Sequence, residues 1–197
     1  MMVKTLKSRC ETMIEVRKSK FYAIALPTSS YENIKENVNL IRQEHPDATH
    51  VVHCAVLGKN RDVFSYSDDR EPKNTAGRPA FEVLKGSDVT NITICIVRYF
   101  GGTLLGTGGL VKAYSDSVKA ILPLLSCEDL IDKTSFKAEF TYDYFTPIKR
   151  LFDEYSVVIE EEQFGVAVTL KCTIPTVNYD ELKDKLVQMT NATIRFI

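Results

Sequence analysis

The sequence has no long apolar run, no disulfide pattern and almost no net charge. No stretch approaches the roughly 20 apolar residues that a membrane-spanning helix needs, and the first residues lack the apolar core of a signal peptide. Its five cysteines are an odd, scattered number without a C-x-x-C pair, which argues against a disulfide framework or a zinc site. A formal net charge of −1 provides no overall basic field for nucleic acid. We therefore expect a soluble, cytoplasmic protein that makes no membrane contact.

The composition that remains is that of an ordinary globular protein. Hydrophobic residues make up 44% and charged residues 26% of the chain, which suffices for a real core. A chain of 197 residues falls between one large domain and two small ones. The pattern changes after Pro123, and residues 126–134 read as a linker. We therefore predict an α+β fold with two domains, residues 1–130 and residues 131–197.

The two predicted domains differ in pattern and in charge. Residues 134–197 read as strand, helix, strand, strand, helix and strand, which is the order of a ferredoxin-like fold. Residues 1–130 alternate strands and helices and predict a mixed α/β sandwich. The second domain carries eight Lys and Arg against eleven Asp and Glu, whereas the first carries 17 against 15. An anionic partner would therefore prefer the first domain.

Capping residues predict where two of the helices begin. Ser29 followed by Glu32 is a capping-box pattern at the start of the first helix. In the second domain, Thr146 followed by Pro147 suits an N-cap and a first helical residue.

The glycine segment, residues 98–114, holds five of the nine glycines and leads from a predicted strand, Ile92–Tyr99, into a helix predicted over Leu110–Leu125. It matches neither the P-loop motif nor the dinucleotide-binding motif G-x-G-x-x-G. In the P-loop frame Thr107 stands where Lys belongs, and in the dinucleotide frame Val111 replaces the last glycine. The segment therefore does not indicate a particular nucleotide as its ligand.

The general chemistry of the glycine segment still suits an anion. Its glycines can take positive φ and present backbone N–H groups, and the start of the following helix carries partial positive charge. Arg98 and Lys112 would add cationic contacts. The alternative is that the glycines only let backbone segments pack closely, with Lys112 and Asp116 forming an exposed ion pair.

The acidic turn, residues 67–79 (SDDREPKNTAGRP), is the second polar motif. Its charged residues are Asp68, Asp69, Glu71, Arg70, Lys73 and Arg78. The three carboxylates would suit Mg²⁺, but the interleaved cations compete for them. We favour a solvated turn with local ion pairs and assign no metal. A third use is a recognition loop for a partner or an RNA backbone.

The histidines do not form an evident site. His50 and His53 lie three residues apart on a predicted strand, so their side chains should face opposite sides of the sheet. We interpret each of them as a core or sheet-face residue. The sequence contains no G-x-S-x-G elbow and no H-E-x-x-H helix, and no catalytic residue or cofactor is assigned.

Four stretches together carry a resemblance to a known family. They are KSKF (18–21), DATHVVHCAV (47–56), SDDREPKNTAGRP (67–79) and RYFGGTLLGTGGLVKAYSDS (98–117). The chain resembles the IMPACT family, in its bacterial YigZ-like branch, over nearly its whole length. The family pattern usually has glycines where this sequence has Arg70 and Asn74.

The resemblance implies a fold for each domain and a link to translation. The first domain is expected to be similar to a domain of a small-subunit ribosomal protein and to one of elongation factor G, and the second to ferredoxin-like domains of that factor. Eukaryotic relatives regulate translation under amino-acid starvation by competing for an activator of a kinase. They do so with an additional N-terminal domain, so we do not expect that partner here.

The resemblance also marks residues by their matched positions. In the glycine segment these are Arg98, Gly101, Gly102, Gly106, Gly108, Gly109 and Lys112. In the acidic turn they are Asp68, Asp69, Glu71, Pro72, Thr75, Gly77 and Pro79. The resemblance brings no catalytic role for any of them.

The leading hypothesis is an RNA- or ribosome-associated regulator of translation. It would bind phosphates through Arg98, Lys112 and the glycine-segment amides, with Lys73 and Arg78 assisting. Few neutralised phosphates predict a shallow salt dependence, and the sequence has no aromatic and basic stripe. One alternative is an enzyme or binder for a phosphorylated small molecule, in which Asp68 or Asp69 holds Mg²⁺ or acts as a base. A further alternative is a protein–protein adaptor acting in translation.

Overall fold

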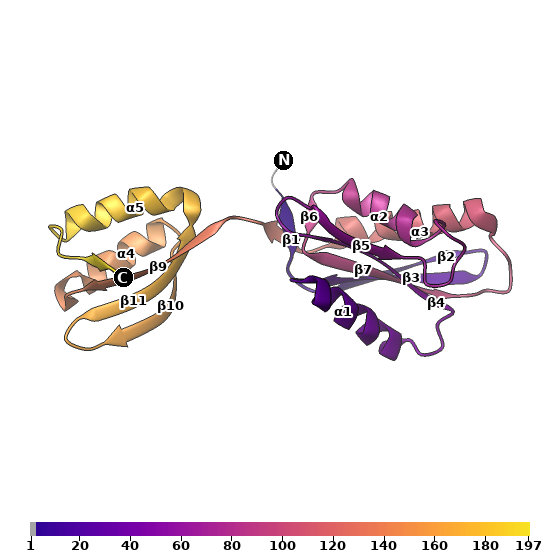
Figure 1. Cartoon of the computed structure of the whole chain (residues 1–197), viewed down its shortest axis with the longest axis horizontal. Helices are drawn as coiled ribbons and strands as arrows, with labels where there is room; N and C mark the ends of the chain where they lie inside the picture. The colour runs from indigo at the N-terminus through magenta and orange to yellow at the C-terminus, as the bar shows by residue number, and fades with distance from the viewer. Residues whose placement is uncertain (1–2) are drawn as a thin grey trace. The chain divides into compact units, whose positions relative to one another are not determined.

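The structure is a computed structural model that describes residues 3–197. The chain divides into two compact units, the first ending at Leu130 and the second spanning Ile131–Ile197. Each unit combines helices with an antiparallel sheet (Figure 1). The predicted α+β class with two domains is confirmed. No helix formed by residues 3–197 is long and apolar enough to cross a membrane.

A five-stranded sheet forms the centre of the first unit. Its strands are β2 (Cys10–Val16), β3 (Ser19–Pro27), β4 (His50–Leu57), β5 (Val63–Ser67) and β7 (Ile92–Tyr99). They lie in the order β2-β3-β7-β4-β5, and every neighbouring pair is antiparallel. The central strand β7 pairs Arg98 with Phe21 on one side and with His50 on the other. This register brings the end of β7 next to the start of β4, where the candidate site lies.

Helices cover both faces of this sheet (Figure 1). They are α1 (Tyr31–Glu44), α2 (Gly77–Lys85) and α3 (Gly106–Ile121), the last followed by a short 3₁₀ turn at Leu122–Leu124. Buried residues of α1 share one core with Ile24 and Val51, whereas α2 and α3 share another with Phe21 and Val52. The middle strands are therefore apolar on both sides, which explains why they read as nearly continuous hydrophobic runs.

Three short strands form a second sheet in this unit. They are β1 (Lys4–Leu6), β6 (Val89–Thr90) and β8 (Cys127–Asp129). β1 lies in the middle, parallel to β6 and antiparallel to β8. Sequence patterns predict neither these strands nor β2, because their apolar residues are few.

The second unit has the predicted β-α-β-β-α-β order. Its elements are β9 (Lys133–Phe140), the 3₁₀ turn Tyr142–Tyr144, α4 (Phe145–Glu154), β10 (Val158–Phe164), β11 (Val168–Pro175), α5 (Thr176–Met189) and β12 (Arg195–Phe196). The sheet order is β10-β11-β9-β12. Alternate residues of β9 and β11 are buried with both helices, while the other face of each strand is polar.

Helix starts differ in detail from the predictions. Ser30, not Ser29, caps α1, since its hydroxyl accepts the Asn33 N–H at 3.1 Å, and Asn33 Oδ1 in turn accepts the Ser29 N–H. The reciprocal cap is thus shifted by one residue, with Asn33 in place of Glu32. α4 begins at Phe145, one residue before the predicted cap, because the preceding 3₁₀ turn already curves the chain.

The start of α3 also differs from the prediction, and it lies at the candidate site. The helix begins at Gly106 rather than Leu110, so Gly106, Gly108 and Gly109 lie in its first turn. Glycine is a poor helix former, which is why the pattern indicates a later start.

Candidate functional site

The acidic turn uses its first carboxylate to fix its own shape. Asp68 Oδ1 accepts the N–H groups of Ala76 (3.0 Å) and Gly77 (2.8 Å), and Oδ2 accepts that of Asn74 (2.8 Å). Asp68 therefore caps α2 in place of the N-cap residue, Ala76, whose methyl side chain cannot accept a hydrogen bond. The Thr75 hydroxyl closes the same turn by donating to the Pro72 carbonyl at 2.6 Å.

The second carboxylate ties the turn to the sheet. Asp69 Oδ2 accepts the Val51 N–H at 2.7 Å, and Oδ1 accepts from Arg42 of α1 at 2.7 Å. Partial burial opposes ionisation of Asp69, but these two hydrogen bonds outweigh it and lower its pKa. Arg70 and Asn74 take φ of +69° and +62°, the left-handed region that explains why glycine is usual at both positions.

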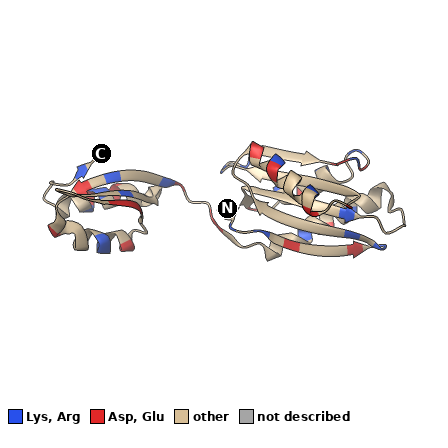
Figure 2. Cartoon of the chain, turned by 90° about the horizontal axis from the view of Figure 1, so that it is seen from below, with Lys and Arg blue, Asp and Glu red and all other residues tan. Residues whose placement is uncertain are grey.

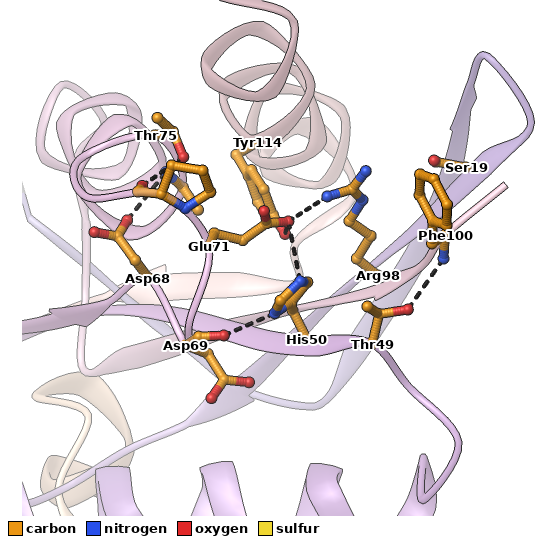
Figure 3. A network of polar contacts seen from close by, with 12 residues as sticks. Ser19, Thr49, His50, Asp68, Asp69, Glu71, Thr75, Arg98, Phe100 and Tyr114 are labelled. Atoms are coloured by element: carbon orange, nitrogen blue, oxygen red, sulfur yellow. Dashed lines mark hydrogen bonds and ion pairs between the residues drawn. The ribbon is translucent and has the colours of Figure 1, made fainter. Parts of the chain in front are cut away.

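The third carboxylate points inward, into a buried polar network (Figure 3). Glu71 Oε1 accepts from Arg98 Nη1 at 2.5 Å and from the Tyr114 hydroxyl at 2.8 Å. Glu71 and Arg98 are 8% and 5% exposed, and Tyr114 is fully buried. Burial, with the Glu71 carboxylate beside it, raises the pKa of Tyr114, so its hydroxyl stays protonated and donates. The acidic turn, β7 and α3 thus meet at one carboxylate.

Arg98 is held between two aromatic rings. Its guanidinium carbon lies 5.5 Å from the centroid of the Phe21 ring and 5.6 Å from that of Phe100. Among the described residues, its Nε is buried and has no hydrogen-bond partner. Because Glu71 neutralises Arg98, the pair presents little net charge to a ligand.

His50 stands at the edge of this network. Its Nδ1 lies 2.8 Å from the Asp69 carbonyl oxygen, and its Nε2 lies 3.8 Å from Glu71 Oε1 (Figure 3). A carbonyl oxygen only accepts, so Nδ1 carries a proton, and Nε2 is the ring nitrogen that faces the Glu71 carboxylate. His53 faces the other side of β4, in a groove lined by α1, as predicted from its spacing.

The glycines of the two motifs serve two different purposes. A Cβ on Gly101 would lie 2.0 Å from the Lys18 carbonyl carbon, and one on Gly77 would lie 2.5 Å from the Ser67 carbonyl oxygen. These two glycines therefore permit close backbone approach. Gly102 and Gly106 instead take φ of +83° and +70°, with open space where a Cβ would stand.

The open glycines leave the N-terminus of α3 accessible. A Cβ on Gly106 or Gly108 would meet nothing within 4 Å, while one on Gly109 would touch only the Leu105 side chain. The N-cap residue, Leu105, supplies no side-chain hydrogen bond, and the first turn holds no acidic residue. The free N–H groups and the positive end of the helix dipole are thus available to an external acceptor.

A pocket of about 450 Å³ joins the two motifs. Its lining residues are Thr49, His50, Glu71, Pro72, Arg98, Phe100, Leu104, Leu105, Gly106, Thr107 and Leu110. Apolar side chains form most of its wall, and His50, Glu71 and Arg98 supply the polar groups. Leu104 is 81% exposed and Phe100 is 46% exposed, so the wall is open to a ligand. Asp68 and Asp69 do not line the pocket.

The predicted cations do not gather at one point. Arg98 is buried in the pocket, whereas Lys112 is exposed and pairs with Asp116 at 2.7 Å, four residues further along α3. Arg78 lies with Pro79 along a groove between α2 and α3, and Lys73 is exposed on the acidic turn. The structure thus separates four residues that the sequence suggests as one set.

Two cations that sequence reasoning does not assign lie close to the glycine segment. Arg17 and Lys18 form the turn between β2 and β3, with φ of +48° and +66°. Arg17 shares a groove with Lys112 and Gly109, and the Lys18 backbone packs against Gly101. Arg17, Lys18 and Lys112 are called the basic rim below. In the view of Figure 2, blue and red residues are mixed, so this rim is a local feature.

The structure also shows a side-chain pairing that the sequence does not predict. Tyr114 lies on the apolar face of α3, where a buried hydroxyl requires a partner, and this is the one signal that points to the network. Nothing in the sequence pairs it with Glu71, 43 residues away. Within residues 3–197, no group of three or more His, Cys, Asp and Glu side chains is placed to hold a metal ion.

These observations define a two-domain α+β protein whose first domain joins an acidic turn and a glycine-started helix around one pocket. Residues 17–122 match the family model described as the Impact N-terminal domain, and residues 139–193 match a domain of unknown function, DUF1949.

Known relatives agree with both matches. An IMPACT family member of Haemophilus influenzae is 34% identical over 91% of this chain and 88% of its own length. The IMPACT family member YigZ of Escherichia coli is 35% identical over 93% of this chain and 91% of its own. A crystal structure of a hypothetical protein is 32% identical, covers 100% of this chain and 97% of its own, and superposes with a TM-score of 0.68. The chain belongs to the IMPACT family.

Proposed function

We propose that the protein binds RNA, on its own or in the ribosome, and regulates translation through the N-terminus of α3. The observation that carries this proposal is the first turn of α3, whose N-cap residue supplies no side-chain hydrogen bond, with Gly106 and Gly108 exposed and with Arg17 and Lys112 along the adjoining groove at Gly109. Backbone N–H groups at a helix start are suited to a phosphate. Family membership supports a role in translation, since the eukaryotic members regulate translation.

The basic rim supplies the charge that this site needs. Buried Arg98 is neutralised by Glu71, so a phosphate would be attracted by Arg17, Lys18 and Lys112 instead. Asp116 lines the same groove and offsets part of the charge of Lys112. Few phosphates are therefore neutralised, and we expect modest affinity with a shallow dependence on salt.

The test is co-sedimentation of the protein with ribosomes and retention of single-stranded RNA, each at low and moderate salt. The rim variant is Arg17→Asn/Lys18→Gly/Lys112→Gln, because Asn and Gly accept the positive φ of this turn. The matched control, Lys133→Gln/Arg150→Gln/Lys183→Gln, removes three exposed cations from the second unit. We expect the rim variant to bind more weakly, with a salt slope smaller by about two, and the control to bind normally.

Two results would contradict the proposal. One is the absence of RNA and ribosome binding by the unaltered protein at low salt. The other is equal loss of binding in the rim variant and in the control, which would indicate a general charge effect.

A second candidate is a binder of a phosphorylated small molecule. The pocket volume lies within the range of about 300–1,000 Å³ that is usual for small ligands. His50 also has the orientation of a group that accepts a proton, with Nδ1 anchored and Nε2 at the pocket. A rise in melting temperature with nucleoside monophosphates, without any RNA retention, would favour this candidate.

A further inference from the structure

We propose that the pocket beside α3 receives a single unstacked nucleobase of single-stranded RNA, and that it prefers a base with an exocyclic amino group. This inference rests on the proposed function, because it assigns the pocket to the same RNA whose phosphate lies at the N-terminus of α3. It assigns a site to the base, whereas the basic rim contacts only the phosphates.

The wall of the pocket suits the face of a base. Phe100 and Leu104 are large apolar side chains that remain 46% and 81% exposed, and Pro72 also lines the pocket. A base that stacks on an aromatic ring and packs against Leu104 would cover this apolar surface. Gly106 and Thr107 lie on the same pocket, so a phosphate at the helix start and its base would fit together.

The polar floor specifies the edge of the base. Glu71 is fixed by Arg98 and Tyr114, and both bonds end on Oε1. Neither bond uses Glu71 Oε2, which is left for a ligand. In its neutral form, His50 adds a second acceptor, Nε2, which lies 3.8 Å from Glu71 Oε1. Two adjacent acceptors require a ligand with N–H donors.

An amino group satisfies this requirement, and bases differ in whether they have one. Cytosine presents the N4 amino group, a known donor to Glu, whereas uracil presents a carbonyl oxygen at the same position. A carbonyl oxygen facing Glu71 and His50 would repel them. The pocket should therefore distinguish cytidine from uridine although both carry the same charge and similar shape.

Duplex RNA should not enter the pocket. Its bases are stacked and their Watson–Crick edges are paired, so neither the face nor the amino group is free. The basic rim, in contrast, contacts phosphates and treats single strands and duplexes alike.

The experiment measures affinity for three labelled RNAs of equal length by fluorescence anisotropy: oligo-C, oligo-U and a C-G hairpin. We expect oligo-C to bind about tenfold more tightly than oligo-U, the size of one hydrogen bond to a charged group. His50→Ala should reduce this ratio towards one, whereas His53→Ala, on the opposite face of β4, should leave it unchanged.

Two further variants test the wall. Leu104→Ala should weaken oligo-C binding about fivefold without changing the salt slope, because it removes apolar contact and no cation. Leu124→Ala is the matched control, since Leu124 is also exposed and lies outside the pocket. Phe100→Leu should weaken oligo-C binding while keeping an apolar side chain over Arg98.

The outcomes separate the inference from the proposed function. If none of the three RNAs binds, the base pocket is wrong, and the proposed function fails as well unless the protein co-sediments with ribosomes. If all three bind equally and Leu104→Ala matches Leu124→Ala, the base pocket is wrong and phosphate binding stands. If free cytidine monophosphate binds more tightly than oligo-C, the occupant is a free nucleotide and assignment to RNA is overturned.

Discussion

The acidic turn and the glycine segment meet at one pocket, yet their polar groups are used in opposite ways. The carboxylates of the acidic turn are all engaged within the protein: Asp68 caps α2, Asp69 binds α1 and β4, and Glu71 binds Arg98 and Tyr114. In contrast, the N-cap residue of α3, Leu105, supplies no side-chain hydrogen bond to the first N–H groups of that helix. The acidic turn therefore mainly builds the site, with Glu71 Oε2 left at the pocket, whereas the first turn of α3 is left open to a ligand.

This difference illustrates how a charged motif can be used to build structure while a nearly uncharged one stays open to a ligand. Ionised groups are costly to bury unless they are paired, so carboxylates near a core acquire partners. Backbone N–H groups at a helix start remain polar without any charged side chain. Stability measurements should therefore respond strongly to the acidic turn and weakly to the helix start.

The largest effect is expected for Glu71→Ala. It leaves Arg98 buried without its counter-ion and removes the acceptor of Tyr114, so unfolding should require about 3–5 kcal/mol less free energy. Chemical denaturation checks this. Glu71→Gln keeps one acceptor oxygen and should cost less. A loss below 1 kcal/mol in Glu71→Ala would mean that the network does not hold the site together.

The next largest effect is expected for Gly101→Ala. Its Cβ would overlap the Lys18 carbonyl, so the β2–β3 turn or the end of β7 must shift, at a cost of about 3 kcal/mol. Gly108→Ala is the matched control, since its Cβ would meet open space within a helix. Because Ala favours the helix more than Gly does, this variant should raise the free energy of unfolding by about 0.5–1 kcal/mol. Thermal melting distinguishes the two, and equal effects would remove the difference between packing and open glycines.

Asp68→Ala should have an intermediate effect. Three N–H groups lose their acceptor and α2 loses its cap, which should cost about 1–2 kcal/mol. Asp68→Asn keeps an acceptor oxygen and should recover part of the loss. If melting shows no difference between Asp68→Ala and the unaltered protein, the turn is held by its other contacts.

Much of the fold is readable from the sequence, because strand and helix periods are strong in the core. Strand β7 has the predicted bounds Ile92–Tyr99, and the β-α-β-β-α-β order of the second unit is confirmed. The start of α3 is not readable, since glycines lower helix propensity while the surrounding structure imposes the helix. The shifted cap at Ser30 shows a similar limit, because two serines in succession compete for one position.

The candidate site is less readable than the fold. Both motifs are visible as composition, but their junction depends on pairings that span the chain, such as Glu71 with Arg98 and Tyr114. Arg98 in particular looks like an anion-binding cation in the sequence and is a buried, neutralised one in the structure. His50 gives no signal at all, because its role depends on the Asp69 carbonyl that the turn brings to it.

Stability measured as a function of pH tests whether ionised Asp69 stabilises the acidic turn. Hydrogen bonds from Arg42 and the Val51 N–H, acting against partial burial, keep its pKa below the usual value of 3.8. Its contribution is therefore complete above pH 3.8 and is lost as the pH falls through the lowered pKa. Asp69→Asn should cost about 1 kcal/mol at pH 7 and little at a pH below the lowered pKa. An equal cost at both pH values would show that the charge of Asp69 does not contribute.

The smallest effect on stability is expected at the helix start, for Lys112→Gln. Lys112 is 78% exposed, and its i,i+4 pair with Asp116 should contribute only about 0.3–0.5 kcal/mol. RNA affinity should respond more than stability, because Lys112 belongs to the basic rim. Lys119→Gln is the matched control, since Lys119 also pairs with Asp116, at 3.5 Å, but lies two turns further from the helix start. If both variants lose RNA equally, α3 attracts RNA through its total charge, and its open first turn is no longer the feature that distinguishes the glycine segment from the acidic turn.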